Sequence, residues 1–232
     1  MAHAVTDVRL AAKRSAAVRA VDRVESGMVV GLGSGSTARF AIEEMGRRLA
    51  LGKLRDIRGI PTSHAARRDA LANGVPVGAL EEVHVADLTI DGADEVDAHG
   101  TLLKGAGGAL LWEKIVASCS RRLIIVVDRT KLVQRIGEKH PLPVEVVAFG
   151  WTTHLDAMRA LGAEPKLRMK RAQEPYTTDE GHYIIDARFP SGIDDPTEVQ
   201  RALRARAGVV ETGLFLGFNP EVIVGDDSRA AP

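Results

Sequence analysis

Residues 28–49, MVVGLGSGSTARFAIEEMGRRL, contain the unit from which the fold can be predicted. The first five residues form a short apolar run that predicts a buried strand. The sequence GSGST at 33–37 predicts a tight turn, and the spacing of apolar residues at 38–49 predicts a helix. A strand, a glycine-rich turn and a helix in this order are typical of a parallel sheet covered by helices.

The same pattern recurs on both sides of this stretch. Apolar runs at 57–60, 88–90 and 123–127 predict further strands, and helical spacing predicts helices at 8–26 and 64–73. Short strands that alternate with helices predict an α/β fold with a parallel, Rossmann-like sheet covered on both faces.

Polar loops follow four of the predicted strands. They are residues 33–37, 62–63, 91–94 and 128–131. Ligands of open parallel sheets bind beyond the carboxyl ends of the strands. We therefore expect these loops, which are distant in sequence, to line one crevice.

The pattern changes after the sequence PLP at 141–143. The predicted strands are then 144–148, 166–170, 183–187 and 209–212, and the predicted helices are 152–161 and one that begins after Asp195. The order βαββαβ predicts a small ferredoxin-like α+β domain. We expect it at 141–208, inserted into a discontinuous Rossmann-like catalytic domain formed by 1–140 and 209–232, whose main sheet regains a strand at 221–224.

Composition limits the class of partner. Basic and acidic residues number 31 each, so no net charge favours nucleic acid or a membrane surface. The single cysteine, Cys119, excludes an intramolecular disulfide, and no run approaches the ~20 apolar residues of a membrane helix. These features predict a soluble, cytoplasmic protein with a small-molecule partner.

The loop at 33–37 combines backbone donors, hydroxyls and a helix N-terminus, which together suit a phosphate group. The alternative is a plain turn capped by Ser36 or Thr37. A dinucleotide fingerprint would require glycine at position 36, and a nucleotide P-loop would require a lysine before its hydroxyl residue. Both are absent, so a smaller phosphate ester is expected.

Two further motifs carry charge. The carboxylates of DGADEVD at 91–97 would repel one another unless cations or ligand hydroxyls satisfy them. Sugar hydroxyls are the favoured partners; an acidic turn is the alternative, and the spacing argues against a calcium loop. The second motif is Lys104, the glycine-rich 105–109 and a helix at 110–118 that carries Glu113. Such a loop can present amides to an oxyanion, although each charged residue alone could be an ordinary surface group.

The strings GLGSGSTA (31–38), DGADEVD (91–97), LLKGAGGALLWEKI (102–115), DRTK (128–131) and PLPVEV (141–146) occur together and in this order. They resemble the ribose-5-phosphate isomerase A family from about residue 13 to residue 225. The resemblance implies an aldose–ketose isomerase of the non-oxidative pentose phosphate pathway, which interconverts D-ribose 5-phosphate and D-ribulose 5-phosphate through a cis-enediolate. It also implies a homodimer or a dimer of dimers and no cofactor. The seven histidines show no ligand-like pairing, so no metal site is expected.

The resemblance also implies residue roles. Glu113 matches the proton acceptor, Asp91 and Lys104 match residues that assist ring opening and polarise sugar oxygens, and Asp94 is the second catalytic carboxylate. The implied substrate-binding residues are Ser34, Gly35, Ser36, Thr37, Asp91, Gly92, Ala93, Asp94, Lys104, Gly105, Ala106, Gly107, Lys131 and, on the phosphate side, Lys13. Two departures are visible: Ala106 replaces a glycine common in the family, and Trp112 replaces arginine or threonine.

Two other classes of protein are compatible with parts of this pattern. A sugar-phosphate-sensing domain would keep the phosphate loop, but it would not need both Lys104 and Glu113 and would usually carry a DNA-reading helix pair. A coenzyme A transferase would use a glutamate nucleophile, so incubation with acyl-coenzyme A would reveal a thioester at that residue.

Overall fold

The structure, a computed structural model, describes residues 2–225, with side chains from residue 9 onward. The chain forms two compact units. Unit 1 comprises the described residues up to 92, together with 112–131 and 218–225, and unit 2 comprises 93–111 and 132–217. Residues 226–232 of the predicted large domain lie outside the described part of the chain.

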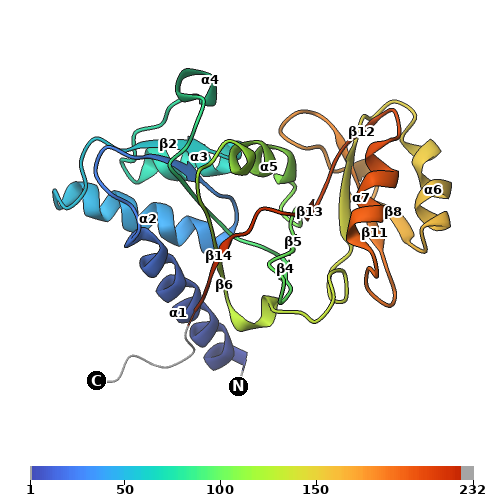
Figure 1. Cartoon of the computed structure of the whole chain (residues 1–232), viewed down its shortest axis with the longest axis horizontal. Helices are drawn as coiled ribbons and strands as arrows, with labels where there is room; N and C mark the ends of the chain where they lie inside the picture. Colours follow the sequence, from blue (N-terminus) through green and yellow to red (C-terminus); the bar gives the residue numbers. More distant parts are fainter. Residues whose placement is uncertain (1, 226–232) are drawn as a thin grey trace. The chain divides into compact units, whose positions relative to one another are not determined.

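Unit 1 contains a five-stranded sheet in which all neighbouring strands are parallel, as predicted. In spatial order the strands are β14 (Glu221–Val224), β6 (Leu123–Val127), β3 (Leu88–Asp91), β1 (Val29–Leu32) and β2 (Arg58–Pro61). The helices are α1 (Ala2–Val21), α2 (Ser36–Ala50), α3 (His64–Ala72), α4 (Leu80–Val83) and α5 (Leu110–Ser118), whose first two residues belong to unit 2 (Figure 1).

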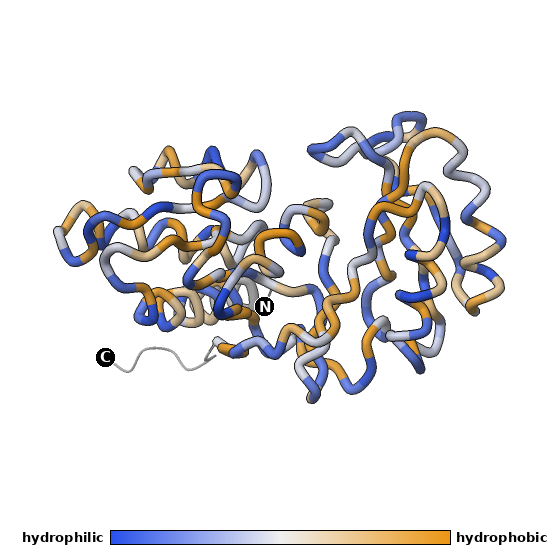
Figure 2. The backbone as a smooth tube through the Cα atoms, turned by 45° about the horizontal axis from the view of Figure 1, so that its top comes forward, coloured by the Kyte–Doolittle hydropathy of each residue, from blue (hydrophilic) through white to orange (hydrophobic). Residues whose placement is uncertain are grey.

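Alternate residues of the strands face opposite sides of the sheet. Val30, Leu32 and Ile90 belong to a buried cluster with residues of α1, α2 and α3. Gly31 faces the other side, where α5 packs against it. The sheet is therefore covered by helices on both faces, as the alternating pattern predicts. Hydrophobic residues, orange in Figure 2, recur along the tube in these elements.

Unit 2 contains an antiparallel sheet in the order β12-β7-β11-β8. Its elements are β7 (Leu142–Val146), the short helices η2 (Trp151–His154) and α6 (Leu155–Ala160), β8 (Glu164–Leu167), β11 (Tyr183–Arg188), α7 (Pro196–Arg204) and β12 (Val209–Thr212). Asp195 caps α7 by accepting a hydrogen bond from the Glu198 N–H, 3.0 Å away. The order βαββαβ and the antiparallel pairing are those of the predicted ferredoxin-like sandwich.

Several short elements were not expected from the sequence. They are β4 (Glu95–Val96), β5 (Leu102–Leu103) and β13 (Leu214–Phe215), which form a small sheet, the pair β9 (Met169–Arg171) and β10 (Glu174–Pro175), and the turn η1 (Arg129–Lys131). The small sheet places 93–111 and 214–217 in unit 2, so the limits of the units differ from the predicted 1–140 plus 209–232 and 141–208. Two-residue strands have no periodicity that a sequence could reveal.

Gly31 sets the distance between α5 and the sheet. A Cβ atom at this position would lie 1.9 Å from Oγ1 of Thr89 and 2.8 Å from Cγ1 of Val116. Thr89 Oγ1 also forms a 2.6 Å hydrogen bond with Oγ of Ser120, two residues beyond α5. Only glycine therefore permits this packing.

We expect Gly31→Ala to lower the free energy of unfolding by about 1–3 kcal/mol, because an added methyl group forces α5 away from the sheet. Gly92→Ala is the matched control, since a Cβ there meets no atom closer than 3.9 Å. Urea unfolding followed by circular dichroism measures both. Equal stability of the two variants would contradict this account of the packing.

Candidate active site

The carboxyl ends of four parallel strands bring the predicted loops of unit 1 to one edge of the sheet. β1 leads into 33–37, β2 into Thr62 and Ser63, β3 ends at Asp91, and β6 leads to Asp128. Because the strands are adjacent and parallel, these ends lie side by side. The expectation that the loops gather is met within this unit.

The loop before α2 leaves the helix N-terminus open. Gly35 is the N-cap residue, with φ 90° and ψ 176°, and no side chain caps the helix. This backbone conformation is accessible to glycine alone. Neither Ser36 nor Thr37 therefore caps the helix, contrary to that part of the plain-turn alternative, and the first amides of α2 remain available to an anion.

Two side chains extend this anion site. Nζ of Lys13, on α1, donates a 2.9 Å hydrogen bond to Oγ of Ser36. Thr37 is buried at the start of α2. A lysine, a hydroxyl and a helix N-terminus thus meet at one place, and each favours negative charge.

The side chain of Ser34 forms hydrogen bonds with the loop that follows β2. Its Oγ lies 2.9 Å from Oγ1 of Thr62 and donates to Oγ of Ser63 at 2.7 Å. Oγ1 of Thr62 donates in turn to the Leu32 carbonyl at 3.0 Å. Ser63 caps α3 by accepting from the Ala66 N–H at 3.0 Å. This chain of hydroxyls fixes the loop after β1 to the loop after β2.

Asp91 is 1 % exposed and shapes the loop beside it. Its Oδ1 accepts hydrogen bonds from the N–H groups of Ser34, at 3.1 Å, and Gly92, at 2.7 Å. A Cβ at Gly33 would lie 2.2 Å from the same oxygen. The absence of a side chain at position 33 lets the carboxylate reach the loop backbone.

Glu113 lies on α5, on the face that covers the sheet. Val116 packs at Gly31, and residues three apart share one helix face. The end of α5 lies beside the start of β3, where the Cys119 carbonyl accepts from the Ala86 N–H at 2.9 Å. The helix therefore runs opposite to the strands, and its N-terminal turn lies toward their carboxyl edge.

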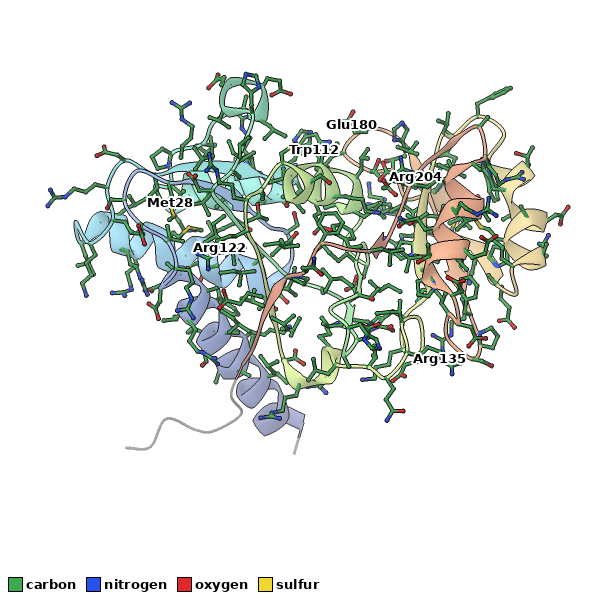
Figure 3. The ribbon with its side chains drawn as sticks, in the orientation of Figure 1. Met28, Trp112, Arg122, Arg135, Glu180 and Arg204 are labelled. Carbon is green, nitrogen blue, oxygen red and sulfur yellow. The ribbon has the colours of Figure 1, made fainter. Side chains whose placement is uncertain are left out.

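Because α5 runs opposite to the strands, Glu113 and Asp91 lie on the same side of the sheet, toward its carboxyl edge. Asp91 shares its side of the sheet with Thr89, two residues earlier, and that side is the one covered by α5. Glu113 lies three residues, a rise of about 4.5 Å, from Val116 toward the carboxyl edge. Its side chain is 5 % exposed. Trp112, labelled in Figure 3, meets His64 of α3 edge to face at 5.2 Å, so this departure from the family pattern serves packing.

Lys131 ends the turn η1, directly beyond β6. The turn is held by Asp128, whose Oδ1 accepts from the Thr130 N–H at 2.9 Å and whose carbonyl accepts from the Lys131 N–H at 3.1 Å. The side chain of Lys131 is half-buried.

In unit 2, Lys104 follows β5 and is 3 % exposed. Its N–H donates to the Gly213 carbonyl at 2.9 Å, and its Nζ lies 5.5 Å from the centre of the Phe215 ring. Asp94 directly precedes β4, and its N–H donates to the Leu103 carbonyl at 2.8 Å. Oδ2 of Asp94 accepts from the Ala106 N–H at 2.8 Å. Asp94 and the loop after Lys104 are thus brought together.

The acidic motif is less exposed to ligand than its sequence suggested. Glu95 is fully buried and accepts from the N–H groups of Gly137, Lys139 and His140. Asp97 accepts from those of His99 and Thr101. The expectation that ligand hydroxyls satisfy the whole motif is wrong for these two residues, because backbone amides already do so. Asp91 and Asp94 remain the candidates.

Among residues 2–225, no group of three or more histidine, cysteine, aspartate or glutamate side chains is arranged to hold a metal ion. The same part of the chain contains no helix long and apolar enough to cross a membrane.

The fold and these groups define an α/β protein with an uncapped helix N-terminus and buried acidic residues at the carboxyl edge of its sheet. The chain matches the family model of ribose 5-phosphate isomerase A (phosphoriboisomerase A) over residues 58–229. The chain belongs to this family.

Relatives and solved structures agree with this assignment. The chain is 54% identical over 217 residues to ribose-5-phosphate isomerase A of Gloeobacter violaceus, covering 93% of this chain and 92% of the relative. The protein of that name in Deinococcus radiodurans is 47% identical over 214 residues, covering 92% and 93%. A D-ribose-5-phosphate isomerase in complex with phospho-erythronic acid superimposes with a TM-score of 0.89 at 39% identity, covering 92% and 93%. The enzyme of Plasmodium falciparum gives 0.89 at 37% identity, covering 93% and 94%.

We expect the double variant Ser36→Ala, Thr37→Ala to raise KM for a phosphorylated sugar about tenfold or more. Each hydrogen bond to a charged group contributes about 1.5–3 kcal/mol, and these hydroxyls lie at the anion site. Ser26→Ala is the control, since Ser26 precedes β1 and its Oγ accepts from the Arg55 N–H at 3.0 Å. Steady-state kinetics decides: an unchanged KM in the double variant would show that the loop is only a turn.

Proposed function

We propose that this protein interconverts D-ribose 5-phosphate and D-ribulose 5-phosphate, the aldose–ketose isomerisation of the non-oxidative pentose phosphate pathway. The observation that carries the proposal is the common setting of Glu113 and Asp91 in unit 1. Both are buried acids at the carboxyl edge, on one side of a sheet whose first loop presents an open helix terminus. The identity of the substrate is inferred from membership in the isomerase family.

The phosphate group binds at the N-terminus of α2. The amides there, the hydroxyls of Ser36 and Thr37, the backbone of Ser34 and Gly35, and the ammonium group of Lys13 hold its charge. Asp94, Lys131 and the backbone of Gly92 and Ala93 bind sugar hydroxyls. These contacts orient carbon atoms that lie several bonds away from the phosphate, which is how remote binding energy assists a reaction.

Glu113 is the base. It removes the proton from C2 of the open-chain aldose, and the electron pair forms a C1–C2 double bond while negative charge collects on O1. The O2 proton passes to O1, Glu113 returns its proton to C1, and C2 becomes the ketone carbon. One carboxylate thus serves both carbons, and no electron leaves the substrate.

The remaining groups act on the oxygen atoms of the sugar. Asp91 and Lys104 assist opening of the sugar ring, and Lys104 together with the turn formed by Gly105, Ala106 and Gly107 balances the charge of the enediolate. Proton transfer and charge balance require neither a metal ion nor a cofactor in this scheme.

The direct test is incubation of purified protein with ribose 5-phosphate, following ketose formation. We expect Glu113→Gln to lower kcat by at least ~10² to 10⁴ while KM changes little, because glutamine keeps the shape of glutamate but cannot accept a proton from carbon. Glu43→Gln on α2 is the control, because the side chain of Glu43 is half-buried and forms ion pairs with Arg14 and Arg39.

The wild-type protein alone tests the activity. If it formed no ketose but was acylated by acyl-coenzyme A at Glu113, it would be a transferase. If Glu113→Gln kept a tenth or more of wild-type kcat, the base would be a different residue, with Asp91 the next candidate.

We further propose a cytoplasmic location and a homodimer or homotetramer, as the family resemblance implies, with no nucleic-acid partner. Light scattering coupled to size-exclusion chromatography measures the oligomeric state.

A further inference from the structure

The loop after Lys104 is a β-turn whose carbonyls all accept hydrogen bonds from residues of unit 2. The Gly108 N–H donates to the Gly105 carbonyl at 3.0 Å and closes the turn. Nη1 of Arg168 donates to the carbonyls of Gly105, at 2.8 Å, and Ala106, at 3.1 Å. Oη of Tyr176 donates to the Gly107 carbonyl at 3.2 Å. All of these residues belong to unit 2.

Arg168 is itself fixed. Its Nε and Nη2 donate to the two carboxylate oxygens of Asp186, on β11, at 2.9 Å and 2.5 Å. Its guanidinium carbon lies 5.7 Å from the centre of the Tyr176 ring, and its side chain is 14% exposed. A two-bond pair with a carboxylate leaves a guanidinium group little freedom. The remaining donor is therefore aimed at the turn.

Tyr176 is suited to the same task. Burial is the main cause that raises the pKa of its hydroxyl above the ordinary value, so the group is protonated and able to donate at neutral pH. A Cβ at Gly108 would lie 2.2 Å from its Oη, so the ring closes directly onto the turn.

The orientation of the carbonyls fixes the orientation of the amides. In a trans peptide the N–H points opposite to the C=O. The Ala106 N–H is used by Asp94, at 2.8 Å, and the Gly108 N–H by the turn itself. Among the described residues, no hydrogen bond is made by the N–H of Gly105, which is buried, or of Gly107, which is exposed. Gly107 thus carries the one exposed amide of the turn that faces away from Arg168 and is still available.

We propose that Arg168, with Tyr176, is a positioning residue for catalysis: it holds the turn so that the Gly107 N–H is the donor to the enediolate oxygen. This rests on the proposed isomerase function and extends it to residues outside the strings that carry the family resemblance. It also explains why alanine is compatible with the reaction at position 106, since that residue contributes its backbone to Asp94 and Arg168.

The test compares Arg168→Lys, Arg168→Ala and Tyr176→Phe with the wild type. Removal of one oxyanion donor typically costs about 10²–10³ in kcat, and a loosened donor costs less, so we expect a fall of about 10- to 100-fold for the arginine variants. The kcat of Tyr176→Phe should fall a few-fold for the same reason, since this change removes the hydrogen bond to one carbonyl of the turn. KM for ribose 5-phosphate should change less than about threefold, because the contact strengthens only as charge develops.

Phospho-erythronic acid separates positioning from general damage, because its carboxylate carries the negative charge that the substrate carbonyl lacks. Its inhibition constant should rise in proportion to the fall in kcat. Guanidinium ions added to Arg168→Ala should restore part of kcat.

Arg188→Met is the matched control. Arg188 also donates to two loop carbonyls in unit 2, those of Gly137 and Glu138, at 3.2 Å and 2.9 Å. We expect this variant to lose stability but to keep its kcat. An Arg168 variant that keeps wild-type kcat and inhibitor affinity would overturn the inference, as would equal loss of kcat in Arg188→Met. If the arginine variants fail to fold, unchanged kcat and inhibitor affinity in Tyr176→Phe would overturn it. An inactive wild-type protein would instead refute the proposed function.

Discussion

The carboxylate of Asp91 holds together the edge of the sheet on which the rest of the site depends. It accepts hydrogen bonds from the backbone of the loop after β1 and from the residue after β3, and it can do so only because Gly33 has no side chain. The conformation of that loop in turn places Gly35 at the start of α2 and leaves the helix N-terminus open. One buried acid thus links the anion site to the strand that carries it.

The two units present different kinds of functional groups. Unit 1 has an uncapped helix N-terminus and a buried acid on α5, which packs closely against the sheet because Gly31 has no side chain. Unit 2 offers a buried lysine over an aromatic ring and a turn with its carbonyls anchored by an arginine and a tyrosine. Acid–base chemistry and oxyanion stabilisation are the two requirements of an enediolate reaction, and the proposed mechanism assigns the base to unit 1 and the oxyanion turn to unit 2.

Much of this could be predicted from sequence. The parallel sheet, the gathering of loops at its carboxyl edge and the ferredoxin-like order all followed from periodicity and turn residues. The strand limits were predicted wrongly where contacts with residues distant in sequence decide the structure. Strand β7 runs over Leu142–Val146 and includes Pro143, whereas the predicted strand was 144–148. Proline rarely lies inside a strand, so the sequence gives little sign of this start. The predicted strand at 166–170 is broken at Arg168, where the side chain turns to the loop after Lys104.

Other features of the site leave no mark in the sequence. Nothing in the composition of DGADEVD reveals that backbone amides from residues 137–140 satisfy Glu95, since those amides come from a distant segment. The same holds for Arg168 and Tyr176, which lie more than 60 positions from the turn they hold and belong to no recognisable motif. Long-range hydrogen bonds are a property of the folded chain, so only the structure shows them.

The most direct measurement of the central claim is the fate of hydrogen at C2 of ribose 5-phosphate. With substrate deuterated at that carbon, early product from the wild-type protein should carry part of the label at C1 of ribulose 5-phosphate, in a single stereochemical position. One base on one face of the enediolate produces this result, diluted by exchange with water. Transfer that is equal at both C1 positions, or that persists unchanged in Glu113→Gln, would contradict the account.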